Sequence, residues 1–397
     1  MKSICPEELC TGCAACANIC PKLCIRIASD REGFLRPEID ESLCIECGKC
    51  RRICPVNAKL KPNTGRPGVF ACWNNNDDVR FASASGGIFS ALAEHVLEGG
   101  GVVFGAAFDE SMHVRHIAVE RKEDLGSLRS SKYVQSDMGE TFIKIKAFLD
   151  EGRKVLFSGT PCQVAALNSF FPNENINLFK IDILCHGVPS PLLFSMHLRH
   201  LETHFKKKIA EYNFRFKGNG WECPTVMVSF KDNTKKELFG LLNSYNYGFL
   251  QYLTLRPACY KCFYRSSERQ GDITLGDFWG IGEKVPFIHK KVKGVSLVLV
   301  NSEKGKKLFE AIGKSVFSEE RTLEEAMYQR ALRHPVIMPS NRSAFFDDFN
   351  RMPYDSLARK YLVDKGIKGV IKNLVPPVWL FKAKKGIGMI RKFLRKN

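Results

Sequence analysis

A cysteine motif that occurs twice near the N-terminus constrains this chain more than any other feature. The spacing C-x2-C-x2-C-x3-C-P begins at Cys10 and begins again 34 residues later at Cys44. Three closely spaced thiolates curl around one corner of an iron–sulfur cluster, and the fourth points away to ligate the other cluster. The motif therefore predicts two 4Fe-4S clusters, one bound by Cys10, Cys13, Cys16 and Cys54, the other by Cys20, Cys44, Cys47 and Cys50.

A pair of structural zinc sites is the alternative, but zinc usually takes C-x2-C pairs from two separated knuckles. Cys5 and Cys24 lie outside the motif, and we expect them to be small buried residues. Between the repeats, apolar residues on either side of the turn 29–33 predict a β-hairpin. We therefore place a ferredoxin-type domain at residues 1–58, followed by a Lys-, Pro- and Gly-rich linker at 59–68.

Composition limits the setting in which these cysteines act. The 397-residue chain holds 16 cysteines, and apolar runs such as 101–108 fall short of the ~20 residues that a bilayer helix needs. Its N-terminus lacks the apolar segment of a secretory signal. We expect a cytoplasmic protein whose thiols serve metal or redox chemistry rather than disulfides.

The formal net charge of +18 is concentrated at the C-terminus. From Leu357 to Asn397 the sequence has 12 Lys or Arg residues and one acidic residue, Asp364. We treat residues 351–397 as a basic helical tail, and its apolar residues, including Trp379, suit contact with an anionic membrane surface. A solvated helix packed on the domain is the alternative. Because the charge is so localised, it gives little support to nucleic-acid binding.

Residues 69–350 alternate short apolar segments with amphipathic ones, which predicts an α/β domain with a mixed sheet. Segments 212–216 and 226–230 look instead like a hairpin or an insertion. Two strand-to-helix junctions, LFSGTPCQVAAL and SASGGIFSAL, place small residues where a helix begins, and such a turn can cradle an anion. Neither junction matches the dinucleotide fingerprint G-x-G-x-x-G.

Four cysteines of this domain also suggest a site. Cys162 and Cys185 follow two predicted strands directly, and Cys259 and Cys262 form a C-x2-C pair. If the loop with the pair folds over the strand ends, the four thiolates converge on a third 4Fe-4S cluster. Alternatively, Cys162 and Cys185 are buried residues and the pair is redox-inert or binds zinc. We expect Cys72 and Cys223 to lie in the core.

The stretches SASGG, GTPCQ, LCHGVPSP and GDITLGDFWGIG, taken together, resemble the beta-subunit family of coenzyme F420 hydrogenases and dehydrogenases, up to about Asn350. The resemblance implies an α/β flavin domain, non-covalently bound FAD and an iron–sulfur cluster close to it, bound by Cys162, Cys185, Cys259 and Cys262. It further implies flavin contacts from Ser85, Gly86, Gly87, Lys132, Tyr133, Gly159, Thr160, Gln163, Gly276, Asp277 and Trp279. The family does not fix the substrate or the use of the deazaflavin coenzyme.

These features predict a flavin-dependent oxidoreductase that exchanges electrons with a redox partner protein and acts on a small organic substrate. His186 is a candidate proton donor, although a structural role is the alternative. We expect His197, His200 and His204 to form the solvated face of a helix. The competing function is a non-catalytic subunit that only relays electrons to another enzyme.

Overall fold

The computed structural model describes residues 3–58, 62–63, 65–363 and Trp379. Its N-terminal part contains two short helices, α1 (Ala15–Asn18) and α2 (Lys49–Ile53), and a two-stranded antiparallel sheet. Strands β1 (Ile25–Ser29) and β2 (Leu35–Ile39) form the predicted hairpin. The Asp30 carboxylate closes its turn by accepting hydrogen bonds from the amides of Glu32 and Phe34, both at 2.9 Å.

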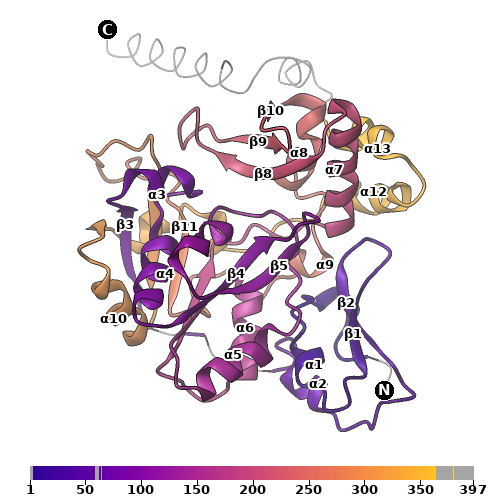
Figure 1. Cartoon of the computed structure of the whole chain (residues 1–397), viewed down its shortest axis with the longest axis horizontal. Coiled ribbons are helices and arrows are strands. Elements are labelled where there is room, and N and C mark those ends of the chain that lie inside the picture. Colours follow the sequence, from indigo (N-terminus) through magenta and orange to yellow (C-terminus); the bar gives the residue numbers. More distant parts are fainter. Residues whose placement is uncertain (1–2, 59–61, 64, 364–378, 380–397) are drawn as a thin grey trace.

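The larger part of the chain is built on a mixed eight-stranded sheet (Figure 1). Four neighbouring strands are parallel, and antiparallel strands flank them on both sides. This confirms the predicted fold class. Across the sheet the order is β13 (Val316–Glu320), β3 (Gly68–Asn74), β12 (Ser296–Val300), β11 (Ile273–Asp277), β7 (Leu178–Ile183), β6 (Val155–Gly159), β4 (Val102–Phe108) and β5 (Val114–Val119).

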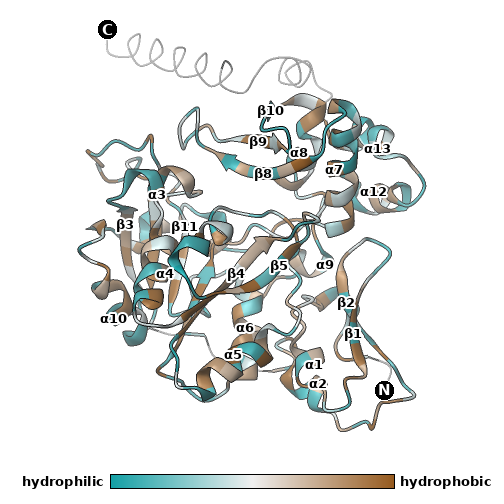
Figure 2. Ribbon diagram, in the orientation of Figure 1, coloured by the Kyte–Doolittle hydropathy of each residue, from teal (hydrophilic) through white to brown (hydrophobic). Residues whose placement is uncertain are grey.

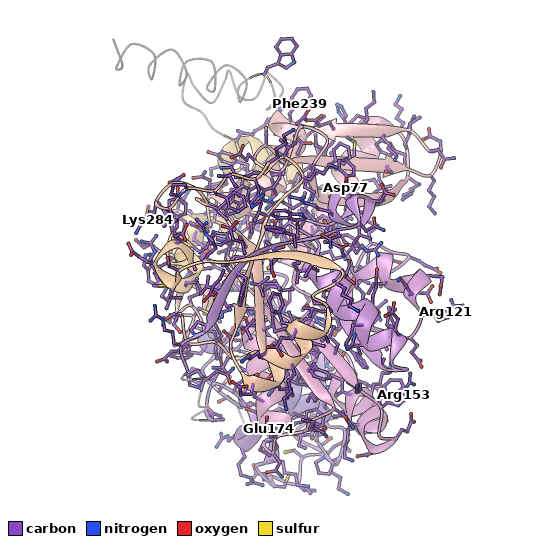
Figure 3. The ribbon with its side chains drawn as sticks, turned by 90° about the vertical axis from the view of Figure 1, so that its left-hand side faces the viewer. Asp77, Arg121, Arg153, Glu174, Phe239 and Lys284 are labelled. Atoms are coloured by element: carbon purple, nitrogen blue, oxygen red, sulfur yellow. The ribbon has the colours of Figure 1, made fainter. Side chains whose placement is uncertain are left out.

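Helices cover both faces of this sheet. On one face, α4 (Ile88–Glu98) and α10 (Glu303–Ala311) pack against β3, β4 and β12. On the other, α5 (Thr141–Asp150) and α6 (Pro161–Phe170) pack against β4 and β6, together with Ala14 and Ala15 of the N-terminal part. Because β4 is covered on both faces, it is apolar along its length, whereas edge strand β5 carries polar residues (Figure 2). Charged residues such as Asp77, Arg121 and Lys284 lie on the outside (Figure 3).

The chain between α7 (Pro191–Phe205) and β11 forms a separate antiparallel sheet of β8 (Ile209–Phe216), β9 (Thr225–Phe230) and β10 (Lys235–Leu238). This sheet contains the expected hairpin. It packs with α7, α8 (Ser244–Leu250), α12 (Arg342–Phe349) and α13 (Tyr354–Tyr361) into one apolar core. Helix α13 lies within the segment that we assigned to the tail, and its Leu357 and Ala358 are fully buried. Except for Trp379, the tail beyond Val363 lies outside the described residues.

The expectation of a solvated histidine face on α7 was wrong for His197. Its imidazole is fully buried, with Nε2 3.1 Å from the Tyr212 hydroxyl and Nδ1 2.9 Å from the Tyr354 hydroxyl. Burial lowers the pKa of His197 to about 3, so the ring is neutral at physiological pH. His197 therefore links α7, β8 and α13, while His204 is exposed as expected. No helix in the described part of the chain is long and apolar enough to span a membrane.

A buried ion pair ties the end of β7 to the loop before β11. The Asp182 carboxylate is fully buried and accepts hydrogen bonds from Arg269 Nη2 (2.8 Å), Thr274 Oγ1 (2.7 Å) and the amides of Gln270 and Gly271 (3.1 and 3.0 Å). Arg269 also donates to the carbonyls of Tyr264, Ser266 and Ile183. The pair therefore fixes the path of the chain that follows Cys259 and Cys262.

We expect Asp182→Ala to lower the free energy of unfolding by about 3–5 kcal/mol, because it leaves the Arg269 charge buried and unpaired. Urea unfolding under anaerobic conditions, followed by circular dichroism, measures this change. Asp150→Ala is the matched control. It removes an exposed partner of Lys146 and should cost no more than about 1 kcal/mol. Equal effects of the two substitutions would contradict the assigned importance of the buried pair.

Candidate functional site

The eight cysteines of the repeated motif line two small cavities in the crossed combination predicted from their spacing. The first also contains Cys5 and Thr11, and the second Cys24 and Lys22. Both loops reach this shape through left-handed residues at equivalent positions, Gly12 and Ala14 in the first and Glu46 and Gly48 in the second. The first cavity is lined by Cys10, Cys13, Cys16 and Cys54, and the second by Cys20, Cys44, Cys47 and Cys50.

Cys5 and Cys24, which we expected to be small buried residues, lie next to these two cavities. Cys24 is 5% exposed, and its sulfur is 3.4 Å from that of Cys20. Cys5 is only half-buried and lies beside Cys10 and Cys54. Cys72 and Cys223 are buried away from the cysteine cavities, as expected.

The four cysteines of the larger domain line a third cavity. Cys162 lies in the first turn of α6, Cys185 follows β7, and Cys259 and Cys262 belong to the loop that begins with α9 (Pro257–Tyr260). Burial raises the pKa of the Cys262 thiol to about 12. Within the described residues, no three His, Cys, Asp or Glu side chains form a group that could hold a single metal ion. The four cysteines instead line one cavity.

Two buried arginines lie in the wall of this third cavity. Arg256 is 3% exposed and Arg265 6% exposed. Arg256 Nη1 donates to the carbonyl of Thr11, and Nη2 lies 3.8 Å from the sulfur of Cys162. The Nε of both residues and Nη1 of Arg265 have no hydrogen-bond partner, and no carboxylate in the described part of the chain pairs with either arginine. Buried cations need a compensating anion, so this cavity suits a negatively charged group.

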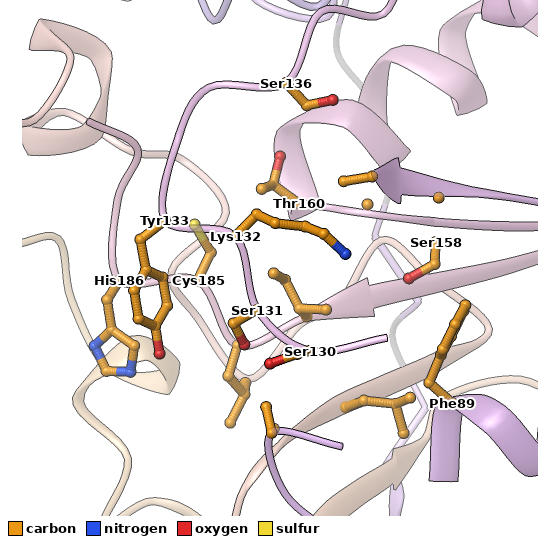
Figure 4. A pocket seen from close by; sticks show the side chains of 18 of the residues that line it. Phe89, Ser130, Ser131, Lys132, Tyr133, Ser136, Ser158, Thr160, Cys185 and His186 are labelled. Atoms are coloured by element: carbon orange, nitrogen blue, oxygen red, sulfur yellow. The ribbon is translucent and has the colours of Figure 1, made fainter. Parts of the chain in front are cut away.

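A cavity of about 280 Å³ lies at the carboxyl ends of β6, β7 and β11, where open α/β sheets bind their ligands (Figure 4). Tyr133, Cys185 and His186 lie at one end of the view, and Phe89 and Ser158 at the other. Of the residues that we expected to contact a flavin, all but one line this cavity: Ser85, Gly87, Lys132, Tyr133, Gly159, Thr160, Gln163, Gly276, Asp277 and Trp279.

Gly86 is the exception, because it lies behind the cavity wall. Its amide donates to Ser296 Oγ at 2.9 Å, and its carbonyl accepts from the amide of Asn74 at 2.8 Å. A Cβ at this position would come within 2.4 Å of the Cys72 carbonyl, so only glycine allows this approach. Gly86 therefore positions Ser85 and Gly87 without contacting the contents of the cavity.

The start of α6 forms one wall of the cavity. The Thr160 amide donates to Gln163 Oε1 at 2.8 Å, and the Thr160 side chain caps the helix in return. Gln163 is thus held in place as part of a capping box. The same turn carries Cys162 into the third cysteine cavity, so a single helical turn contributes to both cavities.

Asp277, which also lines the cavity, organises a polar and aromatic cluster. Its carboxylate pairs with Arg215 at 3.0 Å and accepts from Trp221 Nε1 at 2.6 Å. Trp221 stacks on Trp279 with ring centres 4.5 Å apart. Arg215 also donates to the Tyr133 hydroxyl at 3.3 Å. Arg215 and Trp221 were missed from the sequence because they come from β8 and from the loop between β8 and β9, which no local motif connects to the site.

His116 is a further cavity residue that we did not predict. Its Nδ1 is 2.8 Å from Ser136 Oγ and its Nε2 is 3.1 Å from the Ser158 carbonyl, so Nε2 carries the proton. Burial lowers the pKa of His116 to about 4 and keeps the ring neutral. The period-two pattern of β5 could have identified it, since His116 shares a strand face with buried Val114.

His186 lies where the main cavity meets a second, outer cavity of about 670 Å³, which it lines together with Trp279 and Gln329. Burial, aided by the positive charge of Arg265, lowers the pKa of His186 to about 4. The imidazole is therefore neutral at physiological pH. From this position it can contact a molecule that passes between the two cavities.

The first ferredoxin cavity, the third cysteine cavity and the main cavity adjoin one another. Thr11 lines the first ferredoxin cavity, the third cysteine cavity and the main cavity. Cys185 lines both the third cysteine cavity and the main cavity. The first ferredoxin cavity, which is lined by Cys10, Cys13, Cys16 and Cys54, therefore adjoins the main cavity through Thr11.

Comparison with known proteins supports the resemblance noted from the motifs. Residues 69–142 match the family described as coenzyme F420 hydrogenase/dehydrogenase beta subunit, N-terminal part, and residues 152–326 match its C-terminal part. Residues 9–58 match a 4Fe-4S dicluster domain. No curated protein matches the chain.

A solved structure of the F420-reducing NiFe hydrogenase complex from Methanosarcina barkeri, prepared as a xenon derivative, is 16% identical to the chain. The match covers 76% of this chain and 90% of that chain, with a TM-score of 0.44. The two parts of the family description together span more than half of the sequence. The chain therefore belongs to the coenzyme F420 hydrogenase/dehydrogenase beta-subunit family and carries a 4Fe-4S dicluster domain at its N-terminus.

Proposed function

We propose that this protein is an iron–sulfur flavoprotein oxidoreductase that exchanges electrons between its ferredoxin-type domain and FAD in the main cavity. Membership of a family of redox subunits supports the electron-transfer role. The observation that carries the proposal is that the first ferredoxin cavity, the third cysteine cavity and the main cavity adjoin one another, all three sharing Thr11 and the last two sharing Cys185. The organic substrate would enter through the outer cavity.

A third 4Fe-4S cluster bound by Cys162, Cys185, Cys259 and Cys262 is part of this proposal. Its support is the chemistry of the cavity, in which four thiols face two buried arginines that have unpartnered N–H groups. Four thiolates around an iron–sulfur cluster would supply the missing negative charge. The cluster would lie in a cavity that shares Thr11 with the first ferredoxin cavity and Cys185 with the main cavity, and it would thus connect the ferredoxin domain with the flavin.

The main cavity suits FAD in three respects. The first turn of α6, whose Thr160 and Gln163 line the cavity, places the positive end of a helix dipole beside a diphosphate. Ser130 Oγ lies in the wall, buried and without a hydrogen-bond partner. Tyr133 stacks on Phe249 at 4.4 Å and presents a flat aromatic surface. Bound FAD would supply the conversion between one-electron transfer and two-electron chemistry.

The residues of this chain would orient the reactants and control protons. The Asp277–Arg215 pair and the stacked tryptophans fix the cavity wall and exclude water near the passage to the outer cavity. His186 is our candidate proton donor because it lies at that passage. As a neutral imidazole it would donate through a ring N–H, holding a substrate atom as negative charge develops there.

Lys132 adds a positive charge whose protonation depends on its surroundings. Its ammonium group donates to the carbonyls of Ser127 (2.8 Å) and Arg129 (2.9 Å) at the cavity wall, and burial lowers its pKa to about 7. A flavin or diphosphate close to this amine would favour its charged form. Lys132 would thus respond electrostatically to what the cavity holds.

The proposal also includes contact of the basic tail with an anionic membrane surface, which rests on sequence alone. Because Leu357, Ala358 and Leu362 are buried in the core, a truncation that spares the fold must follow Val363. We expect this truncation to abolish co-flotation with phosphatidylserine-containing vesicles at low salt, since polybasic segments bind such lipids electrostatically. Unchanged flotation would exclude the tail as the membrane contact.

Anaerobic purification followed by iron, sulfide and flavin analysis tests the cofactors. We expect about twelve irons and one FAD per chain, because three cubane clusters hold four irons each. Cys259→Ser should lower the iron content to about eight, while Cys223→Ala, which removes a buried cysteine outside the cavities, should leave it at twelve. Eight irons and no flavin in the unmodified protein would support the electron-relay subunit instead.

The shifted pKa of Lys132 predicts how the stability of the cofactor-free protein depends on pH. Between about pH 7 and 10 the folded chain has lost the Lys132 proton while the unfolded chain keeps it, so unfolding takes up a proton and the free energy of unfolding rises with pH. Lys132→Met should reduce this slope by up to about 1 kcal/mol per pH unit. Urea titrations at several pH values measure the slope, and exposed Lys144→Met should not change it.

A further inference from the structure

The two halves of the ferredoxin-type domain present equivalent loops to different surroundings. A shift of 34 residues relates Leu9, Thr11 and Cys13 of the first loop to Leu43, Ile45 and Cys47 of the second. The first loop is covered by the larger domain: Cys13 is 8% exposed, and Leu9 and Thr11 line the third cysteine cavity. The chain therefore buries one of two equivalent loops against its own redox site.

The second loop is uncovered. Leu43 is 55% exposed, Ile45 is 58% exposed, and Cys47 is exposed beside them. Leu23 lies between Lys22 and Cys24, which line the second ferredoxin cavity. It is 79% exposed and has a left-handed backbone with φ of 50°. A leucine in this conformation is uncommon, and here it holds an apolar side chain in water. We call Leu23, Leu43 and Ile45 the outer patch.

We propose that the outer patch is the docking site for a separate electron-carrier protein whose contact face is apolar and bordered by carboxylates. The inference rests on the proposed electron-transfer function, and it adds the place and chemistry of the partner. Its main support is the relation between the two loops. The loop equivalent to the outer patch lies against the larger domain of this chain. By the same relation, the second loop would bind a separate redox protein.

Charge around the outer patch favours a carrier with an acidic rim. Lys22 and Lys49 line the cavity beneath the patch, and Arg52 donates to the carbonyl of Cys47 at 3.1 Å. In the segments that carry the patch, exposed basic residues outnumber exposed acidic ones: Lys22, Lys49, Arg51 and Arg52 against Asp40, Glu41 and Glu46. The C-terminal segment of this chain is itself strongly basic. Complementarity therefore favours an acidic carrier over that segment as the occupant.

Each productive encounter transfers one electron. When the carrier donates, it is oxidised by one electron and the ferredoxin-type domain is reduced by one, and no covalent bond is made or broken. Exposed Cys47 brings the second cluster site to the surface at this point. The outer patch would give close contact there, and the surrounding basic residues Lys22, Lys49 and Arg52 would steer the encounter.

Stopped-flow reduction of the full-length holoprotein tests the proposal. The probes are a reduced, small, acidic ferredoxin and, as a reductant that needs no docking, reduced methyl viologen. The double substitution Leu43→Gln with Ile45→Gln should lower the second-order rate with the ferredoxin at least tenfold and leave the viologen rate within twofold. Its matched control, Ile288→Gln with Val292→Gln, alters two residues of the larger domain that are 89% and 66% exposed and should change neither rate.

Charge reversal provides a second measurement. Lys49→Glu should lower the ferredoxin rate about tenfold at low salt and flatten its dependence on ionic strength, because steering between opposite charges is screened by salt. Lys306→Glu, at an exposed position of helix α10, is the matched control and should retain the normal dependence.

Three results would overturn the docking site. The first is equal ferredoxin rates for the patch variant and its control, or no ferredoxin reduction of a holoprotein that viologen reduces. The second is concentration-dependent dimerisation that the patch variant abolishes, which would identify a second copy of this chain as the occupant. The third is a faster ferredoxin rate after truncation behind Val363, which would identify the tail. Iron and flavin contents, measured on the same samples, separate these outcomes from a failure of the proposed cofactors.

Discussion

The buried pair of Asp182 and Arg269 is the interaction on which the arrangement of the site depends. Cys162 and Cys185 follow the ends of β6 and β7, whereas Cys259 lies in the short helix α9 and Cys262 in the loop after it. That loop has a fixed path because Arg269 binds three of the surrounding carbonyls and Asp182 accepts two of its amides. Burying a charge pair adds little to the free energy of unfolding, because desolvation of both charges offsets their attraction. Here the pair fixes the loop that brings Cys259 and Cys262 into the same cavity as Cys162 and Cys185.

Polar contacts add to the apolar packing of Ala14, Ala15 and Phe34 in fixing the ferredoxin-type domain to the larger domain. Gln135 exchanges two hydrogen bonds with the backbone of Leu35, and Arg342 pairs with Glu32 at the turn of the hairpin. Arg256 contacts the carbonyl of Thr11 in the cluster loop itself. Such directional contacts define a single orientation, which suits a module that must keep its cofactors at set positions relative to another site.

Cysteine spacing predicted the ferredoxin-type domain, and the alternation of strands and helices predicted the α/β domain with its mixed sheet. The motif at Cys10 and Cys44 allows few arrangements because covalent geometry limits how short loops wrap a cluster, and the two cavities follow the expected crossed grouping. Residues whose role arises from tertiary packing could not be predicted from the sequence. Arg215 reaches the cavity from the second sheet, and Arg256 is recognisable only when its burial is known. His197 was assigned to solvent because helical spacing cannot show that Tyr212 and Tyr354 approach from other elements.

The first turn of α6 has a consequence for how the two proposed redox centres move. Thr160 and Gln163 shape the main cavity while Cys162, between them in sequence, faces the cysteine cavity. The turn is stiffened by its capping box and by Pro161 at the start of the helix. Breathing of the domains or shifts of surface loops would therefore displace both centres together. The tunnelling distance between them would be set by one rigid helical turn and would vary little with thermal motion.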